Sequence, residues 1–146
     1  MKKVVGASPV QADPEQWSEK SKRSISYQYT REYVDIHYVC WRCAAASVFT
    51  AKDQKHTFEV KKASIDQRRI LCSTCWSESN QLRARLAELT SSWAVSKKEL
   101  QRDERFLRTW LELLIGLEEY VPYKPDAARK RMIQRLLTAF KKEDLA

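Results

Sequence analysis

Four cysteines form two pairs with the same short spacing, Cys40-x₂-Cys43 and Cys72-x₂-Cys75, and these pairs include every cysteine in the chain. A Cys-x₂-Cys turn points two sulfur atoms at one ion, so two such turns complete a tetrahedron. Where thiols stay reduced, two pairs of this kind are typical of a zinc site. Four thiolates leave no position for water, so we expect one structural Zn²⁺ bound by Cys40, Cys43, Cys72 and Cys75.

Other chemistries use the same residues and remain alternatives at this point. An iron–sulfur cluster also takes four cysteines, although usually from differently spaced sets. A thioredoxin-like redox pair requires a βαβ context that the surrounding sequence lacks. A zinc site that releases its metal on oxidation is a further alternative to a purely structural site.

The composition predicts a cytoplasmic protein, in which disulfides are disfavoured. Apolar residues make up 43% of the chain and charged residues 32%, which is ordinary for a globular protein. The apolar stretch at residues 4–10 is short and interrupted by Gly6, Ser8 and Pro9, which disfavours a signal peptide. No segment approaches the roughly 20 apolar residues of a membrane span.

The formal charge of +8 is concentrated in two regions. Residues 40–76 and residues 122–146 each carry seven Lys or Arg against three Asp or Glu. This excess predicts nucleic acid or an acidic protein surface as the partner, or else only a soluble basic surface. Exposed aromatic rings at Trp41 and Trp76 would add stacking on bases. The nucleic-acid-binding candidates are Lys61, Lys62, Arg68, Arg69, Arg129, Lys130, Arg131 and Arg135.

No pattern in the sequence predicts an enzyme or a small-molecule substrate. His37 precedes Cys40 closely, but with four cysteines present it is surplus as a ligand, and we expect His56 to be exposed. Neither histidine has a Ser or Cys partner for nucleophilic catalysis, and the chain lacks a glycine-rich phosphate loop. The carboxylates alternate with Lys and Arg, as on solvated helix faces. We therefore expect a non-enzymatic binding module with no catalytic residue.

The elements around the cysteines predict their arrangement. β-prone residues from Tyr33 to Val39 lead into the first pair, and residues 47–50 suit a second short strand. Thr50 begins a helix over residues 51–60, and residues 68–71 are expected to form a strand that returns to the second pair. A helix then carries that pair at its start. A knuckle, a hairpin and a helix in this order form the treble-clef arrangement.

The rest of the chain is predicted to be helical. Leu82, Leu86 and Leu89 repeat with helical period, and residues 90–96 are expected to break that helix. A long helix over residues 96–120 has an apolar face broad enough for a local core, a homo-oligomer interface or a partner interface. The alternative function is therefore a protein-protein interaction or assembly adaptor acting through the C-terminal helices. A last helix follows the prolines at 122 and 125.

The predicted fold class is therefore a small α+β zinc-ribbon or treble-clef module followed by an all-α extension. Residues 1–30 are polar and aperiodic and are expected to form a flexible N-terminal arm, with Trp17 as its anchor. The zinc-binding module takes residues 31–92, and the C-terminal helical extension takes residues 93–146.

Residues 38–76 resemble a probable zinc-ribbon domain family found in uncharacterised bacterial proteins. That family's pattern is similar to "CxxCgxxFxFTxxEQxFY…rxCxxCR", and this chain has "CWRCAAASVFTAKDQKHTFEV" and then "RRILCSTCW". It departs from the pattern at Ala44, Asp53 and Trp76, where the family has glycine, glutamate and a basic residue. The resemblance implies zinc binding by the four cysteines and implies no substrate.

Overall fold

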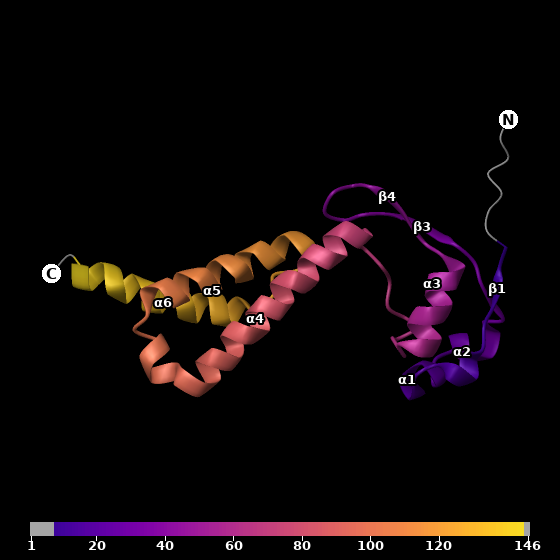
Figure 1. Cartoon of the computed structure of the whole chain (residues 1–146), viewed down its shortest axis with the longest axis horizontal. Coiled ribbons are helices and arrows are strands. Elements are labelled where there is room, and N and C mark those ends of the chain that lie inside the picture. Colours follow the sequence, from indigo (N-terminus) through magenta and orange to yellow (C-terminus); the bar gives the residue numbers. More distant parts are fainter. Residues whose placement is uncertain (1–7, 145–146) are drawn as a thin grey trace. The chain divides into compact units, whose positions relative to one another are not determined.

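The computed structural model describes residues 8–144. Their contacts divide the chain into two compact units (Figure 1). The first contains the residues up to Cys40 together with Ala44–Cys72, and the second contains Trp41–Cys43 together with the residues from Ser73 onward. The first unit mixes short strands with short helices, and the second consists mainly of long helices. A mixed α+β part followed by long helices is the fold class that the sequence predicted.

Two separate antiparallel strand pairs organise the first unit. Strand β1 (Val10–Gln11) pairs with β2 (Glu32–Tyr33), and β3 (Ile36–Val39) pairs with β4 (Ala46–Phe49). In the β3–β4 hairpin, the strand before the first cysteine pair is hydrogen-bonded to the strand after it. The helical segments of this unit are a 3₁₀ turn (Pro14–Gln16), α1 (Glu19–Lys22), α2 (Ser26–Tyr29), α3 (Ala51–Lys55) and a π-helix (His56–Val60).

The core of the first unit joins the N-terminal segment to the strands and to the α3 region. Its buried side chains are Ala12, Trp17, Tyr33, Phe49, Ala51 and Phe58. The indole Nε1 of Trp17 donates to the Tyr33 hydroxyl at 2.8 Å, and that hydroxyl donates to the Glu59 carboxylate at 2.8 Å. Burial alone would raise the pKa of Glu59, but hydrogen bonds from Tyr33, the Asp13 amide and Lys55 lower it overall.

Residues 8–30 therefore differ from the flexible arm expected for residues 1–30, while residues 1–7 lie outside the described residues. Trp17 is 2% exposed and lies in the core. Local signals for order are also present, since the Ser18 hydroxyl accepts a hydrogen bond from the Ser21 amide at the start of α1. The elements here are too short to produce a periodic pattern and depend on long-range packing for their stability.

The helix expected at residues 51–60 is present but changes its winding midway. Thr50 caps α3, because its hydroxyl accepts from the Asp53 amide at 3.1 Å. The π-helix that follows has a hydrogen bond from the Lys61 amide to the His56 carbonyl. Its wider turn lets two consecutive side chains, Phe58 and Glu59, both be buried.

Residues 68–71, which were predicted to be a strand, form a loop without a strand partner within the described chain. Arg68 and Ile70 are exposed, so this segment lacks the buried face that would stabilise a strand. Two side-chain contacts link it to the hairpin: the Tyr38 hydroxyl donates to the Leu71 carbonyl at 2.8 Å, and the Arg69 guanidinium lies over the Phe49 ring.

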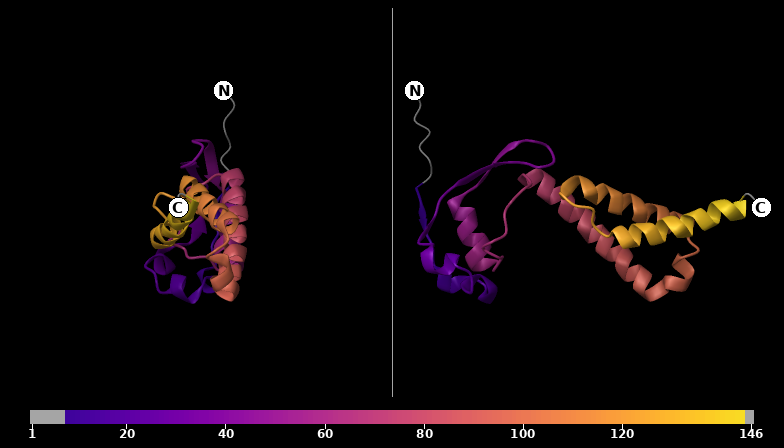
Figure 2. Two further views of the ribbon diagram at one scale, coloured as in Figure 1. Left: turned by 90° about the vertical axis from the view of Figure 1, so that its left-hand side faces the viewer. Right: turned by 180° about the vertical axis from the view of Figure 1, so that it is seen from behind.

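The second unit packs three helices, α4 (Ser73–Leu100), α5 (Glu104–Leu117) and α6 (Ala127–Asp144), with α5 in contact with both others. The further views in Figure 2 show these helices lying alongside one another. A 3₁₀ turn (Glu118–Tyr120) extends α5. Among residues 8–144, no helix has the length and apolar character required to cross a membrane.

The predicted helix boundaries in this unit were partly wrong. Residues 90–95 remain helical, and α4 kinks at Ser96 (φ −125°, ψ 36°) and continues to Leu100. The residue that caps α5 is Asp103, whose carboxylate accepts from the Phe106 amide at 3.1 Å. Trp93 packs on Trp110 of α5, with ring centroids 5.2 Å apart, and this tertiary contact stabilises a segment whose own helix propensity is modest.

The broad apolar face of residues 96–120 is largely buried inside the second unit. Leu107 and Trp110 of α5 and Ile133 of α6 are 0% exposed, and Leu114 is 2% exposed. Ile115, at 48%, points outward. The local core accounts for the apolar pattern, so the pattern itself no longer favours a homo-oligomer through residues 96–120.

Candidate metal centre

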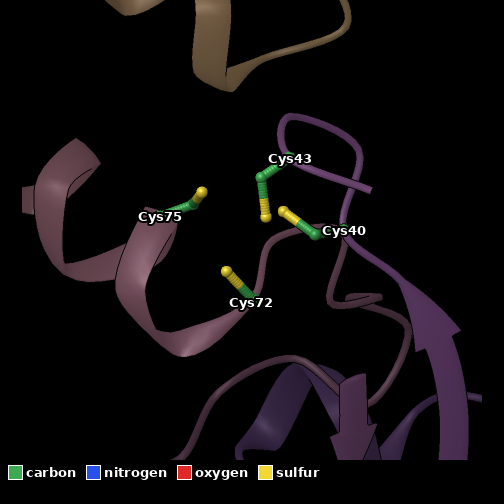
Figure 3. Close-up of side chains that lie close together, drawn as sticks. All are labelled: Cys40, Cys43, Cys72 and Cys75. Carbon is green, nitrogen blue, oxygen red and sulfur yellow. The ribbon is translucent and has the colours of Figure 1, made fainter. Parts of the chain in front are cut away.

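The structure brings the four predicted cysteines together, with their sulfur atoms facing one another (Figure 3). All four Sγ atoms lie within 4.8 Å of one another. A tetrahedral ion with Zn–S bonds of about 2.3 Å requires S–S separations of about 3.8 Å. The four residues therefore fit a zinc site in number, ligand type and spacing.

The first knuckle is a tight turn at the end of β3. The Cys40 amide donates to the Ala45 carbonyl and the Ala44 amide donates to the Cys40 carbonyl, both at 2.9 Å. Ala44 has a φ of 60°, in the left-handed region that glycine adopts without strain. This position explains why glycine suits the residue after the knuckle in the family that the sequence resembles.

Replacing Ala44 by glycine is expected to stabilise the knuckle. A non-glycine residue in the left-handed conformation costs about 1–2 kcal/mol, part of which the greater backbone freedom of glycine offsets. We expect Ala44→Gly to raise the free energy of unfolding by up to about 1 kcal/mol in urea denaturation of the zinc-loaded protein. Ala46→Gly, in β4, is the matched control and should destabilise. If Ala44→Gly and Ala46→Gly destabilised the protein to a similar extent, the claim that Ala44 is strained would be wrong.

The second knuckle lies at the start of α4. Cys72 precedes the helix, and Cys75 lies in its first turn and is 2% exposed. The unpaired amides and partial positive charge at a helix N-terminus favour the thiolate form of a nearby cysteine. Tyr38 supports this knuckle through its bond to the Leu71 carbonyl, and burial raises the pKa of its hydroxyl.

Arg42, which lies between two of the cysteine ligands, is a site residue that the sequence analysis missed. Its Nη1 donates to Cys75 Sγ at 3.6 Å and lies 3.3 Å from Glu78 Oε2, and its Nη2 lies 3.3 Å from Glu119 Oε2. The guanidinium also stacks over the Tyr120 ring, 4.4 Å from its centroid. The hydrogen bond to Cys75 raises the pKa of Arg42 above its ordinary value. The sequence did contain a signal for this role, because a basic residue lies between the two cysteines of the first pair.

The other residues singled out near the cysteines are exposed. His37 pairs with Val48 across the hairpin, and His56 lies at the start of the π-helix. Trp41 and Trp76 are 48% and 53% exposed, as expected for rings available for stacking. Four thiolates around one ion leave no open coordination position, an arrangement that suggests a structural rather than a catalytic role.

The basic candidates of the first unit differ in their surroundings. Lys61 and Arg68 are exposed. The Lys62 ammonium donates to the Gln16 carbonyl. Arg69 lies over the Phe49 ring, 3.9 Å from its centroid, and its guanidinium donates to the Thr57 hydroxyl at 3.3 Å. Two of these four side chains therefore have structural contacts.

The basic candidates of the second unit also separate into two groups. Lys130 is only 7% exposed and forms an ion pair with Glu118, so it is poorly placed to reach a phosphate. Arg129 lies over the Trp110 ring, 5.2 Å from its centroid. Arg131 and Arg135 are exposed and line a hollow on α6.

Comparison with known families agrees with this geometry. Residues 34–84 match the profile of a family described as a probable treble clef domain. The matched segment contains both knuckles, the β3–β4 hairpin and the beginning of α4. Comparisons with curated proteins and with solved structures found no significant match. Residues 34–84 are therefore similar to a probable treble clef domain, their four clustered cysteines fit a zinc site, and long helices follow.

Proposed function

We propose that this protein is a non-enzymatic module in which one structural Zn²⁺ holds the treble clef together and an exposed basic face of α6 binds nucleic acid. Zn²⁺ is the ion that best suits four thiolates in a closed tetrahedral set. The observation that carries the nucleic-acid proposal is the arrangement of side chains on one side of α6.

That side of α6, the α6 basic face, surrounds a hollow of about 600 Å³. All of its lining residues are exposed, and they are Arg131, Gln134, Arg135, Thr138, Ala139 and Lys142. Three of them are basic, one is an amide and one is a hydroxyl, and no acidic residue is among them. These are the donors that typically contact phosphate oxygens.

The spacing along α6 favours an extended anion. Arg131, Arg135, Thr138 and Lys142 are separated by four, three and four residues, so they follow one another along one side of the helix. At 1.5 Å per residue the row is about 16 Å long. A nucleic-acid backbone offers phosphates at intervals over such a length, and the contact would not depend on base sequence.

The first unit offers a weaker alternative site. Lys61 and Arg68 are exposed there, but Lys62 and Arg69 have contacts within the unit. We therefore assign the principal phosphate contacts to the α6 basic face and a secondary role to Lys61 and Arg68.

Reversing the two arginines of the α6 basic face is expected to weaken binding strongly. The double variant Arg131→Glu/Arg135→Glu should bind labelled RNA and duplex DNA about 10- to 100-fold more weakly in fluorescence polarisation near physiological salt. The slope of log affinity against log salt should become shallower by about two. Both residues are exposed, so zinc content and circular dichroism should remain unchanged.

Arg83→Glu/Arg85→Glu provides a control with the same change of net charge on exposed positions of α4. It should weaken binding much less than the α6 variant. Equal losses in the two variants would mean that only net charge matters. If the unmodified protein binds no nucleic acid, an acidic protein surface becomes the partner to test.

A further inference from the structure

The surroundings of Arg42 relate the metal centre to the packing of the helices. Arg42, Cys75, Glu78, Glu119 and Tyr120 all belong to the second compact unit. Arg42 is the one member of this group that comes from the first cysteine knuckle. The others come from the first turns of α4 and from the 3₁₀ turn that ends α5.

Arg42 contacts several groups, and two of these groups also contact each other. Its guanidinium donates to Cys75 Sγ and contacts two carboxylates, those of Glu78 and Glu119. The Tyr120 hydroxyl donates to the same Glu78 oxygen at 2.9 Å, and the Tyr120 ring lies beneath the guanidinium. Tyr120 is 7% exposed, so the set extends from the metal centre into the helix packing.

With a metal bound, Arg42 would also offset negative charge around the cysteine cluster. A divalent ion with four thiolates carries a net charge of −2, and two carboxylates lie close to it. Without a cation among them these anions would repel one another. A single guanidinium can satisfy all of them, because its planar fork offers five donors and its face can stack on a ring.

Arg42 lies between two cysteines of the cluster, so a bound metal would constrain its position. Its neighbours in the knuckle, Cys40 and Cys43, both have sulfur atoms in the cluster. Metal binding would therefore determine where the guanidinium lies, and the guanidinium in turn contacts the end of α5. A ligand that binds only the folded state stabilises whatever structure its site requires.

We propose that Arg42 couples metal binding to the stability of the helical unit, acting as a positioning residue that supports Cys75 and ties the first knuckle to α4 and to the end of α5. The proposal rests on the cysteine site holding zinc and is independent of nucleic-acid binding. Outer contacts of metal ligands typically change metal affinity by about 10- to 100-fold when they are removed.

The test compares the full-length protein with Arg42→Met and Arg42→Lys. Zinc affinity is measured by competition with a chromophoric chelator, and hydrogen exchange of residues 104–120 is followed with and without zinc. In the unmodified protein, zinc removal should speed exchange in that segment. Arg42→Met should bind zinc about 10- to 100-fold more weakly and should exchange quickly there even with zinc bound. Arg42→Lys should be intermediate, because it keeps the charge but loses the fork.

Arg85→Met, on an exposed part of α4, is the matched control and should change neither readout. If Arg42→Met does not fold, Glu119→Gln replaces it, since Glu119 is exposed and the change removes its ion pair with Arg42. Glu119→Gln should reduce the effect of zinc on exchange in residues 104–120.

The proposal would be overturned if Arg42→Met bound zinc within twofold of the affinity of the unmodified protein and zinc had an unchanged effect on its exchange. In the replacement experiment, an unchanged effect of zinc on exchange in Glu119→Gln would do the same.

Discussion

Replacing Cys75 by serine is expected to remove the metal from the protein and to unfold the treble clef. Cys75 is 2% exposed and supplies one of four sulfur atoms that lie within 4.8 Å of one another. Serine is a poor ligand for zinc, and three thiolates bind the ion much less tightly than four. Structural zinc contributes about 10–16 kcal/mol of binding free energy in small zinc domains, so this loss is large beside the stability of a domain.

Metal analysis by mass spectrometry and near-ultraviolet circular dichroism measure the effect. The unmodified protein should contain about one zinc per chain, and both Cys75→Ser and Cys72→Ser should contain little. Thr74→Ser, a change between these two ligands, should keep the metal and the spectrum. A Cys72→Ser variant with full zinc content would remove the basis for the four-cysteine site. Iron in place of zinc would favour the cluster alternative.

Truncating Trp17 to alanine is expected to be the most damaging change outside the cysteines in the first unit. The indole is 2% exposed, contacts the ring of Tyr27 edge-on, and donates to the Tyr33 hydroxyl. Removing a buried tryptophan costs about 3–5 kcal/mol through lost burial and the cavity that remains. The change also removes the hydrogen bond that links the N-terminal segment to Tyr33 and Glu59.

Urea denaturation of the zinc-loaded protein gives the free energies of unfolding for this comparison. Tyr29→Ala, another aromatic truncation in the same segment, is the control, because Tyr29 is 73% exposed and its loss should cost less than about 0.5 kcal/mol. If Trp17→Ala lowered the free energy of unfolding by less than about 1 kcal/mol, residues 8–30 would be the flexible arm that the sequence predicted.

Some local predictions were confirmed because their physical causes lie within a few residues. The strands beside the first knuckle were found where β-branched and aromatic residues are dense, at Ile36–Val39 and Ala46–Phe49. The Thr50 cap depends on an interaction three residues away. The spacing within each cysteine pair was sufficient to predict that the four cysteines cluster.

Other predictions failed where distant residues decide the outcome. Residues 90–95 remain helical because Trp93 packs against Phe106 and Trp110, a contact that no local propensity encodes. Lys130 is a surface candidate by composition, yet it is buried beside Glu118 because α6 packs on α5. The role of residues 8–30 likewise depends on Trp17 reaching a core formed by later segments.

By itself, then, the sequence determined which four cysteines cluster, the treble-clef order of elements and the helical character of the C-terminal half, since each follows from residue type and short-range spacing. Only the tertiary structure decided which side chains are available. It buried the apolar face of α5, placed Arg42 beside Cys75, and left Arg131 and Arg135 exposed on the α6 basic face. The physical reason is that burial, ion pairing and stacking depend on neighbours brought together by folding, and spacing along the chain does not specify those neighbours.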